Sequence, residues 1–121
     1  MKKLLLALML LSPFSLADWG DVYYCQTTNF SDITLEGKAK NYTLEKFQFK
    51  LDKTKKAMVF GSSGYFKGTE AKLTPDSHWP SLESWYSHEK YAVYYFKEGK
   101  FLYVSNGSMG ALSMSADCDK F

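Results

Sequence analysis

The residue types that could support catalysis or bind a metal are few in this chain of 121 residues. The two histidines are His78 and His88, and acidic residues lie near them at Asp76, Glu83 and Glu89. Zinc sites generally use histidines about three to five residues apart, and the spacing of 10 here carries no such signal. A G-x-S-x-G nucleophile elbow is also missing from the sequence. We therefore expect no catalytic residues, no metal site and no cofactor, and keep a small hydrolase as an alternative.

The two cysteines, Cys25 and Cys118, lie near opposite ends of the chain. Neither a C-x-x-C spacing nor clustered histidines accompany them, which disfavours redox chemistry and metal binding. In an oxidising compartment, a pair of this kind is typical of a single disulfide. The sequence therefore predicts a disulfide that joins the N- and C-terminal strands.

The first 17 residues have the pattern of a secretory signal peptide. Two lysines precede an apolar run from Leu4 to Leu11, and Ala17 occupies the position before the expected cleavage site. The run is far shorter than the ~20 apolar residues of a membrane-spanning helix, and no other segment qualifies. We expect residues 1–17 to be removed, residues 18–121 to form a single β domain without a transmembrane segment, and this domain to be periplasmic or secreted.

The charge of the mature chain is balanced. All 15 basic residues are lysines, and two of them lie in the leader, so 13 lysines face 13 acidic residues. Residues 38–56 carry seven lysines and two acidic residues. This segment is either an anion-facing surface or an ordinary solvated strand face. Neutral charge and export both disfavour binding to nucleic acid, so we expect no nucleic-acid partner.

Alternating residues predict antiparallel β-structure. Phe47, Phe49 and Leu51 alternate with polar residues. A phase slip between Leu44 and Phe47 indicates a β-bulge at this point.

The end of the chain carries the clearest strand signals. Residues 91–97, 101–105 and 111–118 are expected to form consecutive antiparallel strands. Turns are expected at Glu98-Gly99 and near Asn106-Gly107, the latter pair being a type I′ signal that requires a positive φ at the glycine. With about seven or eight short strands, the chain is predicted to be all-β, either a small antiparallel up-and-down barrel or a β-sandwich.

Aromatic side chains gather in residues 77–91, which interrupt the rhythm of the strands. Tryptophan and tyrosine offer a flat apolar face with a polar group, which suits sugars, lipids or proteins. We expect Trp79, Trp85 and Tyr86 to contact the ligand or partner; alternatively, the tryptophans cap the core. The predicted function is that of a small, exported, monomeric and non-catalytic binding module. Its ligand would be a small apolar molecule or a sugar, or it would bind a protein partner.

Three features resemble the periplasmic C-type lysozyme inhibitors: Tyr23-Tyr24-Cys25, the terminal Cys118, and the stretch Gly61-Ser62-Ser63-Gly64-Tyr65. That family inserts a loop of the form S-x-S-G-x-x-Y into the lysozyme cleft. Here Tyr65 follows Gly64 directly, so the intervening residues of the family's loop are missing. The resemblance implies a small β-barrel that inhibits an extracellular hydrolase, with Ser63 and Tyr65 at the inhibitory positions.

Overall fold

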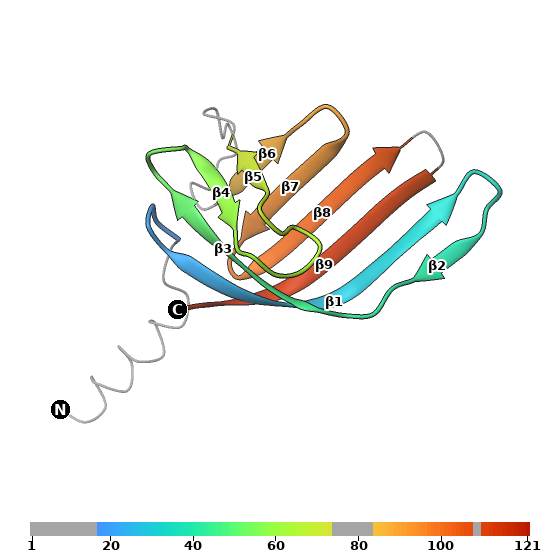
Figure 1. Cartoon of the computed structure of the whole chain (residues 1–121), viewed down its shortest axis with the longest axis horizontal. Helices are drawn as coiled ribbons and strands as arrows, with labels where there is room; N and C mark the ends of the chain where they lie inside the picture. Colours follow the sequence, from blue (N-terminus) through green and yellow to red (C-terminus); the bar gives the residue numbers. More distant parts are fainter. Residues whose placement is uncertain (1–16, 74–83, 108–109) are drawn as a thin grey trace, which may run out of the picture.

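A computed structural model of the chain describes residues 17–73, 84–107 and 110–121, in which nine β-strands form one sheet (Figure 1). The strands are β1 (Val22–Thr34), β2 (Ala39–Asn41), β3 (Lys46–Asp52), β4 (Ala57–Phe60), β5 (Glu70–Lys72), β6 (Trp85–His88), β7 (Ala92–Lys97), β8 (Lys100–Gly107) and β9 (Gly110–Lys120). Residues 1–16 of the expected signal peptide lie outside the described ranges. Within those ranges, no helix is long and apolar enough to cross a bilayer.

The sheet curls into a nearly closed up-and-down barrel, which confirms the predicted all-β fold. Its strand order is β5-β4-β3-β1-β9-β8-β7-β6, and β2 pairs with the second half of β1. β5 and β6 are the two ends of this order and lie next to each other. Because the first and last strands of the chain pair directly, the barrel is closed there, and its seam lies between β5 and β6.

The predicted disulfide joins the two terminal strands. Cys25 and Cys118 stand opposite each other in the β1–β9 ladder, with 4.0 Å between their Cα atoms. Both side chains are buried in the hydrophobic core. The disulfide therefore fixes the register at the place where the two ends of the chain meet.

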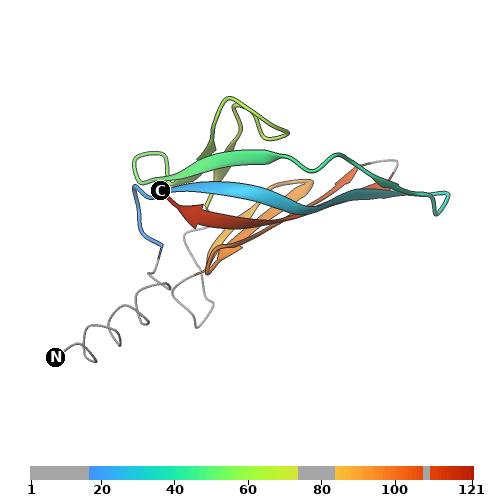
Figure 2. The same ribbon diagram turned by 90° about the horizontal axis from the view of Figure 1, so that it is seen from below.

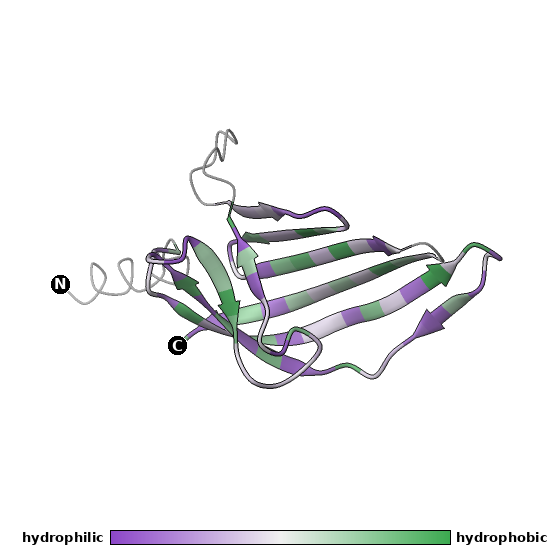
Figure 3. Cartoon of the chain, turned by 45° about the horizontal axis from the view of Figure 1, so that its top comes forward, coloured by the Kyte–Doolittle hydropathy of each residue, from purple (hydrophilic) through white to green (hydrophobic). Residues whose placement is uncertain are grey.

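Aromatic side chains fill the interior of the barrel. Figure 3 shows bands of differing hydropathy along the strands. Along β8, successive side chains alternate between the core and the outside, because Phe101 and Tyr103 are buried whereas Leu102 and Val104 are exposed. The largest fully buried side chains include Phe49, Phe66, Phe96 and Phe101. Their rings pack edge-to-face or tilted, with centroids 5.1 Å apart for Phe49 and Phe96 and 5.5 Å apart for Phe66 and Phe101.

The C-terminal hairpins form as predicted, but Asn106 and Gly107 do not form the expected type I′ turn. Glu98 and Gly99 join β7 to β8 with φ values of 50° and 76°, which is the positive φ that a two-residue turn of this kind requires. The type I′ prediction for Asn106-Gly107 is wrong. Both residues belong to β8, where Gly107 pairs with Gly110 and does not have a positive φ. The ladder between β8 and β9 stays in register as far as the pair of Gly107 and Gly110, so Asn106 and Gly107 still lie within β8.

The first strand is one continuous element of 13 residues, and its ladder with β9 contains a bulge. β1 pairs with β9 from Tyr23 to Thr34 but changes its other partner from β3 to β2. The register of the β1–β9 ladder shifts between Thr27 and Asn29, which marks a bulge in β1. The bulge predicted between Leu44 and Phe47 is wrong, because β3 begins at Lys46 and pairs with β1 in unbroken register. Residues 42–45 run between two strands without belonging to either.

The glycine pair at the end of the β8–β9 ladder allows a direct test of the packing of β9 on β1. A Cβ atom on Gly110 would lie 2.2 Å from the carbonyl oxygen of Ile33, whereas one on Gly107 would meet nothing within 4 Å. We expect Gly110→Ala to lower the free energy of unfolding by about 1–3 kcal/mol and Gly107→Ala to leave it nearly unchanged. Urea unfolding of both variants measures the difference, and equal stabilities would contradict this packing.

Candidate functional site: the β4–β5 loop

The connection between β4 and β5 is an exposed loop that is bonded to the barrel at its base. It comprises residues 61–69, and Figure 2 shows it in yellow-green, standing away from β1 and β3. Ser62, Ser63, Gly64 and Tyr65 are all exposed. The residues to which the resemblance assigns inhibition therefore lie on a protruding surface.

The loop is closed at its base by backbone hydrogen bonds. The N–H of Phe60 donates to the carbonyl of Thr69 at 2.9 Å, and the N–H of Gly68 donates to the carbonyl of Gly61 at 3.0 Å. The N–H of Gly61 also donates to the carbonyl of Gln48 on β3 at 3.0 Å. These bonds hold both ends of the loop together and attach it to the barrel.

Phe66 anchors the far side of the loop in the core. Only 1% of its surface is exposed, although its neighbour Tyr65 is 49% exposed. The ring of Phe66 stacks on Phe60 with centroids 4.7 Å apart and meets the edge of Tyr103 at 4.8 Å. A loop that carries a buried phenylalanine next to its exposed tip has little freedom to move.

A second anchor starts from the bulge in β1. Thr27 is buried, and its hydroxyl accepts a hydrogen bond from the N–H of Glu45 at 2.6 Å and donates one to the carbonyl of the same residue at 3.0 Å. The carboxylate of Glu45 then accepts the N–H of Tyr65 at 2.8 Å. β1 thus positions Glu45, and Glu45 positions the backbone of the loop tip.

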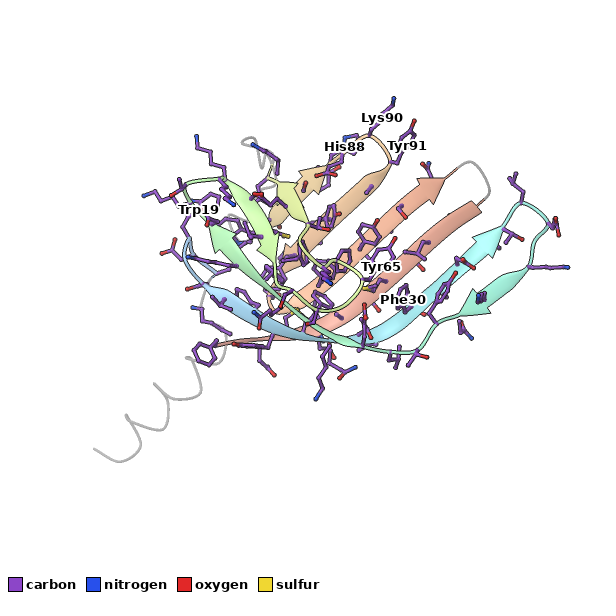
Figure 4. All side chains as sticks on the ribbon, in the orientation of Figure 1. Trp19, Phe30, Tyr65, His88, Lys90 and Tyr91 are labelled. Carbon is purple, nitrogen blue, oxygen red and sulfur yellow. A yellow bond between two sulfur atoms is a disulfide. The ribbon has the colours of Figure 1, made fainter. Side chains whose placement is uncertain are left out.

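The ring of Tyr65 covers one end of the core. It lies beside Phe30, with ring centroids 5.5 Å apart, as Figure 4 also shows. Burial and, to a lesser extent, a hydrogen bond with the hydroxyl of Tyr103 raise the pKa of Tyr65 to about 12. The Tyr65 hydroxyl is therefore neutral at physiological pH, and one face of its ring is available to a partner.

The aromatic residues expected to bind a ligand are only partly described. Trp79 lies outside the described residues. Trp85 and Tyr86 are consecutive on β6 and therefore point to opposite faces of the sheet. Trp85 is half-buried against the core and meets the edge of Trp19 at 4.8 Å, whereas Tyr86 stacks parallel to His88 at 6.4 Å. A contact of these residues with a ligand stays a prediction.

The groups considered for a hydrolase or a metal site are also only partly described. His88 is exposed at the end of β6, while His78, Asp76 and Glu83 lie outside the described ranges. In those ranges, no three histidine, cysteine, aspartate or glutamate side chains come together as a metal site would require. The shifted pKa values there belong to tyrosines and to Lys55, which pairs with Glu70 at 2.9 Å.

Sequence reasoning did not find the residues that support the loop. Thr27 and Glu45 are separated by 18 residues, and they face each other because the register of the β1–β3 ladder continues by one position beyond Gln26 and Lys46. The exposed tip of the loop is held by the buried Phe66, by the carboxylate of Glu45 and by the backbone hydrogen bonds at its base. Comparisons of the chain with protein-family models, curated proteins and solved structures find no match.

Proposed function

We propose that the chain is an exported, non-catalytic protein that binds a protein partner through the β4–β5 loop. The partner we infer is an extracellular hydrolase, with a C-type lysozyme as the first candidate, and the loop would enter its catalytic cleft. The observation that carries this proposal is the exposed Ser62-Ser63-Gly64-Tyr65 tip, which is fixed by the buried Phe66 and by the carboxylate of Glu45.

A rigid loop supports this function for an energetic reason. Binding normally costs about 0.5–1.5 kcal/mol for each side chain that must be immobilised. The loop tip is already ordered before a partner arrives, so less of the interaction energy is lost. Serine and glycine also make the tip narrow, which suits insertion into a concave surface.

The alternative functions receive less support from the described residues. A small apolar ligand inside the barrel would compete with Phe49, Phe96 and Phe101, whose side chains fill the interior. A hydrolase would need an acid or base whose pKa lies close to neutral pH. The pKa values of Tyr65 and Tyr94 are instead raised further above neutral pH. Export is supported by the disulfide, since such bonds persist in oxidising compartments.

The proposal is tested with the mature chain, residues 18–121, in its oxidised form. We expect it to bind C-type lysozyme in calorimetry and to lower the rate of cell-wall lysis. Tyr65→Ala should weaken binding by about 2 kcal/mol, which is roughly 30-fold, because large aromatic residues at the centre of an interface carry much of the affinity.

Tyr91→Ala is the matched control. Tyr91 is 61% exposed and lies at the β6–β7 turn, apart from Tyr65 in Figure 4. This variant should bind lysozyme as the unmodified chain does. The proposal fails if the unmodified chain neither binds nor inhibits the enzyme, or if both tyrosine variants weaken binding equally.

A further inference from the structure

The outer surface of the barrel carries two ordered rows of polar side chains across β9, β1 and β3. In the ladders, Tyr24 stands opposite Asp119 on one side and Gln48 on the other. Two residues further along, Gln26 stands opposite Asp117 and Lys46. Residues directly opposite each other on neighbouring antiparallel strands lie about 4.5–5.5 Å apart, so the six side chains form one continuous patch.

This patch surrounds a hollow of about 300 Å³. Its lining consists of the six side chains of the patch together with Cys25, Phe47 and Ser63. Cys25 and Phe47 are buried and point into the core, so the backbone of β1 and β3 forms the floor. The β4–β5 loop forms one wall, because Gly61 lies so close to Gln48 that an added Cβ would be 2.8 Å from its Cγ. Volumes of this size are typical of small-ligand sites.

Two exposed aromatic rings lie at this surface. Tyr24 is 45% exposed and Phe121 is 88% exposed, and their ring centroids are 5.4 Å apart. The position of Phe121 is fixed in part by its N–H, which donates to the carbonyl of Val22 at 2.8 Å. Such rings contribute little to the core and offer an apolar platform on the outside of the barrel.

The charges around the hollow cancel. Asp117 pairs with Lys100 on β8 at 2.6 Å, and Asp119 lies in the same hollow as Lys46. A strongly charged ligand would therefore gain little net attraction. Gln48, Ser63 and Lys46 supply hydrogen-bond donors, while Asp119 and the glutamine carbonyl supply acceptors. This combination matches a ligand rich in hydroxyl groups, each of which both donates and accepts.

We propose that this outer hollow is a binding site for a neutral oligosaccharide, with a sugar ring stacked on Tyr24 and its hydroxyls bonded to Gln48 and Asp119. The site goes beyond the proposed docking function, because its aromatic platform lies on β1 and not on the loop tip. Ser63 at its rim is the one residue that both surfaces share.

The test is a titration of the isotope-labelled mature chain with neutral tetrasaccharides, followed by NMR. The probes are cellotetraose, maltotetraose and chitotetraose, with tetragalacturonate as an acidic comparison. We expect at least one neutral probe to cause saturable shifts at residues 24–26, 46–48 and 117–119. Tyr24→Ala should weaken that binding about tenfold, and tetragalacturonate should bind no more tightly than the neutral sugars.

Two control variants and one further test variant separate this site from the loop and from a folding defect. Tyr91→Ala and Tyr65→Ala should bind the sugar normally, although we expect Tyr65→Ala to impair binding of a hydrolase. Asp119→Ala, which changes an exposed side chain, should weaken sugar binding several-fold without lowering the melting temperature, so the result does not depend on Tyr24→Ala alone.

The proposal is overturned if no neutral probe gives saturable shifts, or if the shifts are confined to residues 84–91. Unchanged affinity in both Tyr24→Ala and Asp119→Ala would overturn it as well.

Discussion

Removal of the Cys25–Cys118 disulfide is expected to lower the free energy of unfolding by about 4–5 kcal/mol. The two cysteines are separated by 93 residues, so the bond removes much of the conformational freedom of the unfolded chain. A double Cys25→Ala, Cys118→Ala variant and the reduced native chain should both show this loss in urea unfolding.

Loss of the disulfide should also weaken the pairing of β1 with β9. β1 and β9 are the first and last long strands of the chain, and their ladder joins residues that the short hairpin turns do not bring together. Without the disulfide, pairing of these two strands must close nearly the whole chain as one loop. Reductant should have no effect on the double alanine variant, and coincident unfolding midpoints for the oxidised and reduced native chain would contradict the prediction.

Strands with a regular alternation of residues could be predicted from the sequence. Phe47, Phe49 and Leu51 are all buried on β3 as their spacing indicated. The turn at Glu98-Gly99 was also predictable, because a glycine between two runs of β-forming residues marks a tight turn and adopts a positive φ without strain. Local chemistry determines both features, and tertiary contacts do not override it.

The second half of β1 could not be predicted in the same way. Ser31 and Asp32 belong to a polar stretch that reads as a loop, yet they pair with β2 and β9. This part of β1 extends towards the β1–β2 hairpin, which projects from the barrel in Figure 1, and buries few side chains there. Polar residues are tolerated in such a strand because its partners supply backbone hydrogen bonds without a core.

The candidate sites were predictable only in part. The sequence identified the loop through its glycines and serines, but not the hydrogen bond between Glu45 and the backbone of Tyr65. The alternation on β3 placed Lys46 and Gln48 on the outer face. Their proximity to Asp119 depends on the register of β1 with β9. This register cannot be derived from the alternation of residues alone; the pairing of Cys25 with Cys118 defines it.

Phe66→Ala is expected to cost about 3–5 kcal/mol of stability, as large-to-small substitutions of fully buried aromatic residues do. The side chain contacts aromatic rings on several strands, including Phe47 on β3, Tyr94 on β7 and Phe101 on β8. Its removal would leave a cavity that these rings, held by their own packing, can fill only in part. Chemical unfolding of the variant measures the loss.

The neighbouring position provides the control for this variant. Tyr65→Ala should lower stability by less than Phe66→Ala, because half of the Tyr65 side chain is already exposed, while Phe66→Leu should retain much of the stability by filling most of the space. If the loop is rigid because Phe66 holds it, Phe66→Ala should also increase hydrogen exchange at the amides of Gly64 and Tyr65 in the folded protein. A Phe66→Ala variant as stable as Tyr65→Ala, with unchanged exchange in the loop, would show that the core does not anchor the loop. The rigidity of the tip would then have to come from Glu45 and the backbone hydrogen bonds at its base.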